Sequence, residues 1–159
     1  NLNGNIQFET VNGEINDRQS SGELRFSAVN GDIKSTSSAN DVRLENVNGD
    51  IEFTLSAIKN LRINTVNGEA EVQINELLKG GDVRFESVSG DADFYFPQSV
   101  SAKFEIKAHA NGKIINKVSS DKVSKAKYGP ASDLEFSING GNANVEMDTI
   151  SGRIELRTK

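Results

Sequence analysis

The sequence predicts an all-β protein built as a single-domain parallel β-solenoid of about seven coils, each 18–22 residues long. A short motif, Val47-Asn48-Gly49-Asp50-Ile51, recurs along the chain, and self-similarity at a period near 20 residues is typical of repeat architectures. Apolar residues alternate with polar ones, as at Ala92, Phe94 and Phe96, which is the period of a strand. No stretch of ten residues or more has the apolar pattern of an amphipathic helix.

Each copy of the repeat places apolar residues at four positions, separated by two, three and four residues. The middle copy has Val42, Leu44, Val47 and Ile51 at these positions. Five more copies keep the spacing: Ile6/Phe8/Val11/Ile15, Leu24/Phe26/Val29/Ile33, Leu61/Ile63/Val66/Ala70, Val83/Phe85/Val88/Ala92 and Val145/Met147/Ile150/Ile154. The copies start 18, 18, 19, 22 and 62 residues apart, and the long gap contains a degenerate copy near Phe104.

The corners of the repeat have their own period. Glycine or asparagine recurs every nine residues over the first half of the chain, at Gly4, Gly13, Gly22, Gly31, Asn40 and Gly49. Both residue types tolerate a positive φ angle. Each unit is therefore interpreted as short strands joined by tight corners.

Two arrangements of these strands are compatible with the pattern. Asn-Gly between alternating runs is typical of a hairpin, so an antiparallel meander is one of them. The other is a solenoid, in which equivalent residues stack from coil to coil. We favour the solenoid, because the same apolar residue precedes each corner and a meander does not require that.

The solenoid makes two predictions about its corners. Side-chain amides and glycines should stack as a corner ladder, with amide hydrogen bonds between coils, at Asn12, Asn30, Asn48, Asn67, Gly13, Gly31, Gly49 and Gly68. The repeat valine should face the core, so Val47→Asp is expected to destabilise the protein more than Asn48→Ala.

The single domain has three parts. Residues 1–100 are the regular array. Residues 101–132 hold the degenerate coil and a basic loop, with an excursion from the array near 115–132. Residues 101–128 carry a net charge of +5, against −5 for the whole chain. Residues 133–159 return to the array as closing coils, of which we expect the last to end the stack.

Composition limits the chemistry that is possible. The chain has no cysteine, so thiolate chemistry and disulfides are excluded. No stretch approaches the ~20 apolar residues of a membrane span. The chain opens inside a repeat, because Leu2-Asn3-Gly4-Asn5-Ile6 is already the end of one, so we expect native sequence upstream.

The repeats resemble the bacterial adhesin-like domain family DUF4097. The similarity is carried by the Val-Asn-Gly-Asp-Ile motifs, Phe96-Pro97, Asn111-Gly112-Lys113-Ile114-Ile115 and the closing Thr149-Ile150-Ser151-Gly152-Arg153-Ile154. It covers essentially the whole chain. It implies a right-handed β-helix, export to the periplasm or cell surface, and no catalytic residue or cofactor. Arg153 replaces the usual acid, which fits a terminal coil.

Four arginines form the main candidate binding site. Arg25, Arg43, Arg62 and Arg84 occupy the same outward position in successive copies, about 4.8 Å apart in a solenoid. Such a row can bind the carboxylates or phosphates of an extended anionic polymer. The alternative, which the sequence favours, is neutralisation by acids two residues away on the same face: Glu23, Asp41, Glu45, Asp82 and Glu86.

Other charged groups are weaker candidates. A row of corner acids, Glu14, Asp32, Asp50, Glu69 and Asp91, lacks the Gly-Gly-x-Gly-x-Asp corners of calcium-binding solenoids, so no metal site is predicted. The basic segment 101–128 can dock an anionic surface, but it lacks the interleaved aromatics of single-stranded nucleic-acid binders. His109 is the sole histidine and has no Gly-x-Ser-x-Gly motif beside it, so we predict no catalytic triad.

These observations predict a non-enzymatic protein of the bacterial cell envelope, acting as an adhesin-like binding or structural module. Its expected partner is an anionic envelope polymer or another envelope protein, and not nucleic acid. Two alternatives remain open. One is a β-helix enzyme that acts on an acidic polysaccharide along the arginine row. The other is an envelope-stress signalling accessory that binds a membrane partner.

Overall fold

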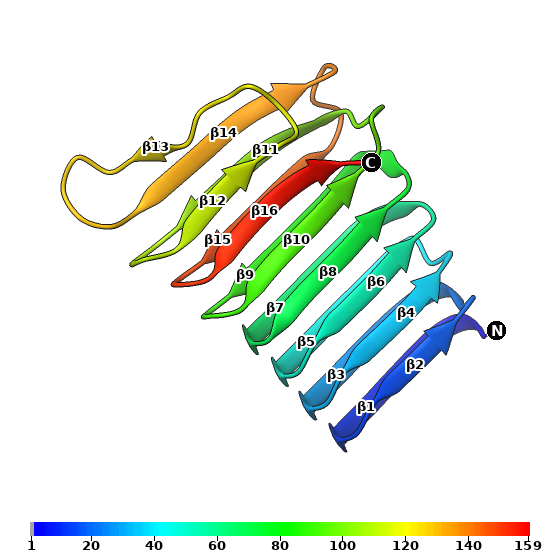
Figure 1. Cartoon of the computed structure of the whole chain (residues 1–159). Helices are drawn as coiled ribbons and strands as arrows, with labels where there is room; N and C mark the ends of the chain where they lie inside the picture. Colours follow the sequence, from blue (N-terminus) through cyan, green and yellow to red (C-terminus); the bar gives the residue numbers. More distant parts are fainter. Residues whose placement is uncertain (1) are drawn as a thin grey trace.

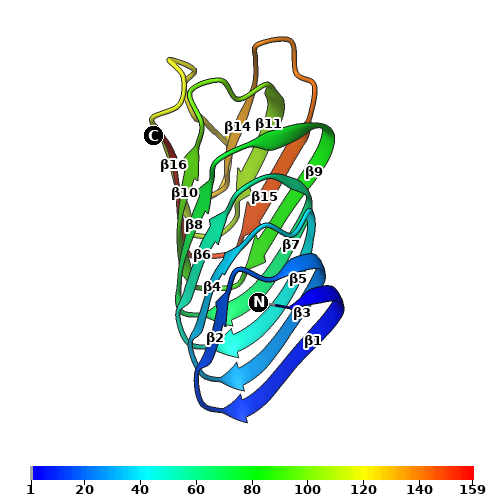
Figure 2. The same ribbon diagram turned by 90° about the vertical axis from the view of Figure 1, so that its right-hand side faces the viewer.

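The computed structural model describes residues 2–159, which form two sheets packed face to face around one core (Figures 1 and 2). Sheet A contains nine strands in the order β1 (Asn3–Asn12), β3 (Ser21–Asn30), β5 (Asp41–Asn48), β7 (Ile58–Asn67), β9 (Leu77–Ser87), β15 (Asn144–Thr149), β11 (Ala102–Ala108), β14 (Ser132–Ile138) and β13 (Ser124–Lys125). Sheet B contains seven in the order β12 (Lys113–Asn116), β16 (Arg153–Thr158), β10 (Asp91–Phe96), β8 (Glu69–Ile74), β6 (Ile51–Leu55), β4 (Ile33–Ser37) and β2 (Ile15–Arg18).

The prediction of a parallel β-solenoid is confirmed. Strands alternate between the two sheets, and equivalent residues of successive copies pair in parallel, as Arg25 does with Arg43 and Ile33 with Ile51. This register excludes the meander. Residues 2–159 contain no α-helix, and so none that is long and apolar enough to cross a membrane.

Five coils, β1 to β10, stack in chain order, and the coils β15–β16 and β11–β12 then extend the stack out of chain order. The coil of β15 and β16 lies between β9–β10 and β11–β12, and Figure 1 shows the red β16 wedged between earlier strands. Ile154 pairs with Ala92 on one side and with Ile114 on the other. The expectation of a terminal last coil is therefore wrong.

The end of the stack is covered by chain that the array does not use. β14 pairs antiparallel with β11, and the short β13 pairs antiparallel with β14. The Phe104 and Phe136 rings stack across the first of these pairs, with centroids 4.6 Å apart. The excursion between β12 and β14 lies where the sequence placed it. After β12, the chain folds back as β14 over the end of the stack. It then returns as β15 and β16, which fill the gap between the β9–β10 coil and the β11–β12 coil.

The core lies between the two sheets and follows the period of two. In β5, Val42, Leu44 and Asn46 face inward, whereas Arg43 and Glu45 are exposed. Each fully buried aliphatic or aromatic side chain contributes about 1.5–3 kcal/mol of transfer free energy. Every coil adds several such side chains, so a thin core continues along the whole stack.

The corner glycines are required because successive coils approach closely. A Cβ atom on Gly49 would lie 2.2 Å from the Gly31 carbonyl oxygen, and one on Gly31 would lie 1.9 Å from that of Gly13. The same geometry continues at Gly68, where a Cβ would lie 2.1 Å from the Gly49 oxygen. No side chain larger than hydrogen fits in this column without separating the coils.

The repeat valine faces solvent, contrary to the expectation from the sequence. Val47 is 40% exposed, while the preceding Asn46 is 3% exposed. The reason is that β5 continues without a corner to Asn48, so a residue three positions after the buried Leu44 must lie on the opposite face. Asn46 instead fills the inner corner and donates its Nδ2–H to the Gly49 carbonyl oxygen at 3.1 Å.

Candidate binding site on the outer face of sheet A

The four predicted arginines form one row on the outer face of sheet A, which we call the ladder face. Arg25 pairs with Arg43, Arg43 with Arg62 and Arg62 with Arg84 in the strand register. All four side chains are exposed. Neighbouring strands are about 4.8 Å apart, so the structure presents four guanidinium groups at regular intervals.

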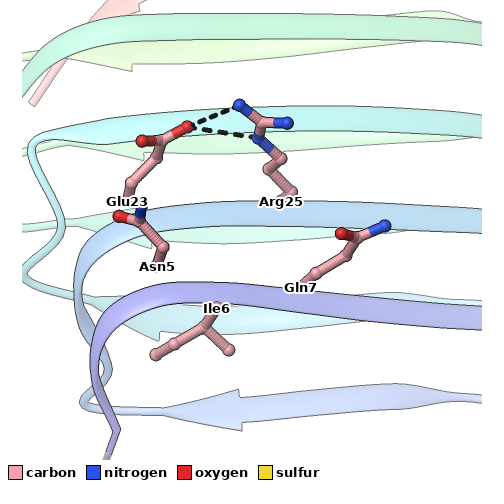
Figure 3. A pocket seen from close by; sticks show the side chains of 5 residues that line it. All are labelled: Asn5, Ile6, Gln7, Glu23 and Arg25. Atoms are coloured by element: carbon pink, nitrogen blue, oxygen red, sulfur yellow. Dashed lines mark hydrogen bonds and ion pairs between the residues drawn. The ribbon is translucent and has the colours of Figure 1, made fainter.

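The two ends of the row are neutralised by acids on their own strands. Arg25 donates from both Nε and an Nη atom to the Oε1 of Glu23, at 3.1 and 2.9 Å (Figure 3). Arg84 Nε lies 3.2 Å from the Oδ2 of Asp82. These are the same-face salt bridges expected from the sequence, and they occur with the acid that precedes the arginine.

The centre of the row is different. Within residues 2–159, neither Arg43 nor Arg62 has a carboxylate oxygen within 4.0 Å. Asn60 stands where β3, β5 and β9 carry an acid two residues before the arginine, and Asn64 stands where β5 and β9 carry an acid two residues after it. Asn60 donates to the Oδ2 of Asp41 at 3.3 Å. A shallow surface depression here is lined by Asp41, Val42, Arg43, Asn60, Leu61, Arg62, Asp82 and Arg84. Arg43 and Arg62, at the centre of the row, are therefore in no direct ion pair, although Asp41 and Glu45 lie on the same face of β5 as Arg43.

Beyond Arg84 the same row changes sign. Its next members are Glu146, Glu105 and Glu135, from β15, β11 and β14. The rows on either side now carry lysine: Lys103 lies 3.1 Å from Glu135, and Lys107 lies 3.4 Å from Glu105. A hydrogen bond to Glu135 raises the pKa of Lys103, and one to Glu105 raises the pKa of Lys107.

An apolar row runs along the edge of the ladder face, beside the charged rows. It consists of the repeat valines and their last equivalent, which are 38–64% exposed: Val11, Val29, Val47, Val66, Val88 and Ile150. Solvent-facing apolar side chains in an unbroken line are typical of contact surfaces. Sequence reasoning missed this row because it placed these residues in the core. The available signal was that each repeat valine lies three residues, an odd number, after a buried strand residue, which places it on the opposite face.

The corner ladders lie next to the valine row. Asn30, Asn48 and Asn67 each donate a side-chain N–H to the Oδ1 of the asparagine one coil before, at 3.3, 3.1 and 3.1 Å. The corner acids accept backbone N–H groups from the next coil: Asp32 from Asp50 at 2.9 Å, and Asp50 from Glu69 at 3.0 Å. In the described chain no three His, Asp or Glu side chains are grouped to hold a metal ion.

The remaining candidates are dispersed. Of the basic segment 101–128, Lys103 and Lys107 lie on the ladder face, whereas Lys117 pairs with Glu155 on sheet B at 2.7 Å. His109 Nε2 lies 3.0 Å from Asp148 Oδ1, at the end of the valine row. No serine hydroxyl in residues 2–159 is hydrogen-bonded to this histidine.

Comparison with known proteins agrees with this architecture. Residues 1–157 match the family described as Toastrack DUF4097. The chain belongs to the Toastrack DUF4097 family. The match spans nearly the whole Toastrack repeat array, including the coil that is inserted out of order. No curated protein and no solved structure matches this Toastrack chain.

Proposed function

We propose that this Toastrack domain is a non-enzymatic, adhesin-like binding module of the bacterial cell envelope, which uses the ladder face to hold acidic groups of another macromolecule. The observation that carries the proposal is that Arg43 and Arg62, at the centre of the arginine row, are in no direct ion pair. An exposed guanidinium without a carboxylate partner keeps its donors free for a ligand.

The geometry of the row suits an extended ligand better than a small one. Guanidinium groups about 4.8 Å apart can each bind a carboxylate or phosphate of a repeating chain. The depression between Arg43 and Arg62 is shallow and open, so contact would be made along a line. The adjacent valine row adds apolar surface that leaves water when a partner docks.

Placement in the envelope rests on the resemblance of the repeats to exported bacterial domains. It also agrees with the choice of ligand, since envelope macromolecules commonly carry carboxylates and phosphates. A chain without cysteine is insensitive to the redox state of its compartment.

A second candidate is an enzyme that acts on an acidic polysaccharide. The observation that favours it is the pair of His109 and Asp148, 3.0 Å apart on the same face as the arginine row. A histidine held by a carboxylate can act as a general base. Incubation with polyuronates would then release unsaturated chain ends, and loss of that product in His109→Ala would establish the enzyme.

The test of the binding module is a panel of anionic envelope polymers, measured by calorimetry at low and high salt. We expect the wild type to bind at low salt, and Arg43→Gln/Arg62→Gln to lose most of that affinity. Lys34→Gln removes one positive charge from the outer face of sheet B and is the matched control. Equal binding by the double variant and the wild type would exclude the arginine row as the site.

A further inference from the structure

The ladder face is complementary to itself when the order of its strands is reversed. Along sheet A the central row contains Arg25, Arg43, Arg62 and Arg84, followed by Glu146, Glu105 and Glu135. We propose that a second copy of this chain docks on the ladder face about a two-fold axis that runs along β9. This inference rests on the proposed function, because it names a partner for the same contact surface.

The symmetry decides which residues meet. A two-fold axis parallel to the strands, in the plane of the interface, places each row of side chains opposite the same row of the second copy. It also reverses the order of the strands. With the axis on β9, the strand order of sheet A places β7 opposite β15, β5 opposite β11, and β3 opposite β14. Closed two-fold contacts of this kind are the commonest in soluble oligomers.

Away from the axis, the central row then pairs opposite charges. Arg62 faces Glu146 of the second copy, and the symmetry repeats this contact on the other side of the axis. Arg43 likewise faces Glu105, and Arg25 faces Glu135. The two arginines that have no carboxylate within 4.0 Å among residues 2–159 of their own chain each gain one.

The flanking rows match in the same register. On β5 the outward-facing charges are Asp41, Arg43 and Glu45, whereas on β11 they are Lys103, Glu105 and Lys107. Asp41 therefore faces Lys103 of the second copy, and Glu45 faces Lys107. Inversion of all three charges between two strands that the symmetry brings together is the strongest argument for this axis.

The apolar row also meets itself. Val88 faces Val88 of the second copy, and Val66 faces Ile150. Apolar side chains that are about 40% exposed in the single chain would be covered by each other. Removal of this row from water supplies a driving force that does not depend on charge.

The size of the face is adequate for a specific contact. Seven strands and a six-residue width correspond to about 34 by 20 Å, or roughly 1,300 Å² of total buried surface, from the standard strand dimensions. Specific interfaces bury more than about 1,000 Å². Sheets that pack face to face keep their strands within about 30° of each other, as this axis requires.

The charged contacts on β9 itself oppose the docking, because the axis places Asp82, Arg84 and Glu86 each opposite the same residue of the second copy. Each Arg84 keeps its own Asp82, whose Oδ2 lies 3.2 Å from Nε, so these two charges meet their copies as neutralised pairs.

The experiment is sedimentation velocity on wild type, Arg62→Glu, Glu146→Arg, and an equimolar mixture of the two variants. We expect a reversible wild-type dimer that weakens between ~0.05 and ~0.5 M salt. Each single variant should raise the dissociation constant about tenfold or more, because like charges then meet twice. The mixture should restore dimers near wild-type strength, since the carboxylate introduced in one variant meets the guanidinium introduced in the other.

Lys34→Glu, on the outer face of sheet B, is the control and should dimerise like the wild type. A monomeric wild type at every concentration overturns the inference, as do single variants that dimerise normally or a mixture that fails to recover. The polymer assay separates the two proposals. Polymer binding that depends on Arg43 and Arg62, with a monomeric wild type, leaves the proposed function standing and removes only the homotypic contact.

Discussion

Arg153 donates its backbone N–H to the Oδ1 of Asp91 at 2.9 Å, although 62 residues separate them in the sequence. The Arg153 guanidinium also lies 3.7 Å from Asp93. The five regular copies before it carry an acid where Arg153 stands, and the degenerate copy carries Lys113. In the last copy that position faces two acids of β10. The substitution therefore belongs to a coil that is inserted into the stack, between β10 and β12.

Deletion of residues 144–159 should disrupt far more than one coil. Without β15 and β16, the unit of β11, β12 and β14 loses its parallel neighbours in both sheets. We expect this variant to unfold with a much smaller urea m-value, because m scales with the surface exposed on unfolding.

Deletion of residues 1–18 is the matched control, since it removes the single coil at the opposite end. We expect it to keep a cooperative transition, with an m-value reduced only in proportion to chain length. Equal behaviour of the two deletions would mean that the last coil contributes no more than a terminal one.

Val47 and Leu44 should respond very differently to the same substitution. Val47 is 40% exposed, so Val47→Asp should change the free energy of unfolding by only about 0.5 kcal/mol. Leu44 is fully buried, so Leu44→Asp should cost about 4 kcal/mol or more by burying an unpaired carboxylate. Urea denaturation measures both. Similar costs would contradict the assignment of the two faces of β5.

Asn48→Ala should be more damaging than Val47→Asp, which reverses the order expected from the sequence alone. The Asn48 side chain donates to Asn30 and accepts from Asn67, both at 3.1 Å. Loss of two exposed hydrogen bonds should cost about 1–2 kcal/mol. The comparison uses the same urea assay, with Asn64→Ala as an outward asparagine outside the ladder.

The period of the repeat was sufficient to predict much of this fold. Spacings of 18 and 19 residues placed Arg25, Arg43 and Arg62 in one row, because parallel stacking brings equivalent positions together. The spacing within a copy was misread at Val47. The recurring apolar character of Val47 suggested a core position, whereas β5 runs straight through to Asn48 and period two turns the valine outward.

The order of the coils could not be read from the repeat. A parallel strand accepts either neighbour if the apolar pattern matches, and β11 and β15 both fit beside β9 in this respect. The choice depends on contacts far apart in sequence, such as Arg153 with Asp91. The change of sign from Arg84 to Glu146 was hidden for the same reason, since only the inserted coil makes these residues neighbours.

A comparison of Gly49→Ala with Gly80→Ala should separate the cost of steric conflict from the cost of backbone strain. A Cβ on Gly49 would lie 2.2 Å from the Gly31 oxygen and 2.6 Å from the Gly31 carbonyl carbon, at a φ of +130°. Gly80 has a φ of +74° but open space around its Cβ position, so Gly80→Ala reports strain alone. We expect about 1 kcal/mol for Gly80→Ala and about 3 kcal/mol or more for Gly49→Ala. Equal costs in thermal unfolding would show that the coils separate freely.

Glu155 should make stability depend on pH. Its side chain is 4% exposed, and its Oε1 lies 2.7 Å from Lys117 Nζ and 2.8 Å from an Nη atom of Arg157. The hydrogen bond from Lys117, together with the charge of Arg157, lowers the pKa of Glu155 below its ordinary value of 4.5, although burial opposes this. The folded state therefore holds the proton less tightly than the unfolded state.

A lowered folded pKa stabilises the protein fully above the unfolded value and loses that contribution as pH falls through the folded value. The difference in unfolding free energy between wild type and Glu155→Gln should thus be constant from neutral pH to about 5 and shrink towards pH ~3. Urea denaturation across this range measures it. In a Lys117→Met background the folded pKa of Glu155 lies closer to its ordinary value, so the loss should be smaller and should be complete at a higher pH. Curves that stay parallel in both backgrounds would show that Glu155 is not held by these partners.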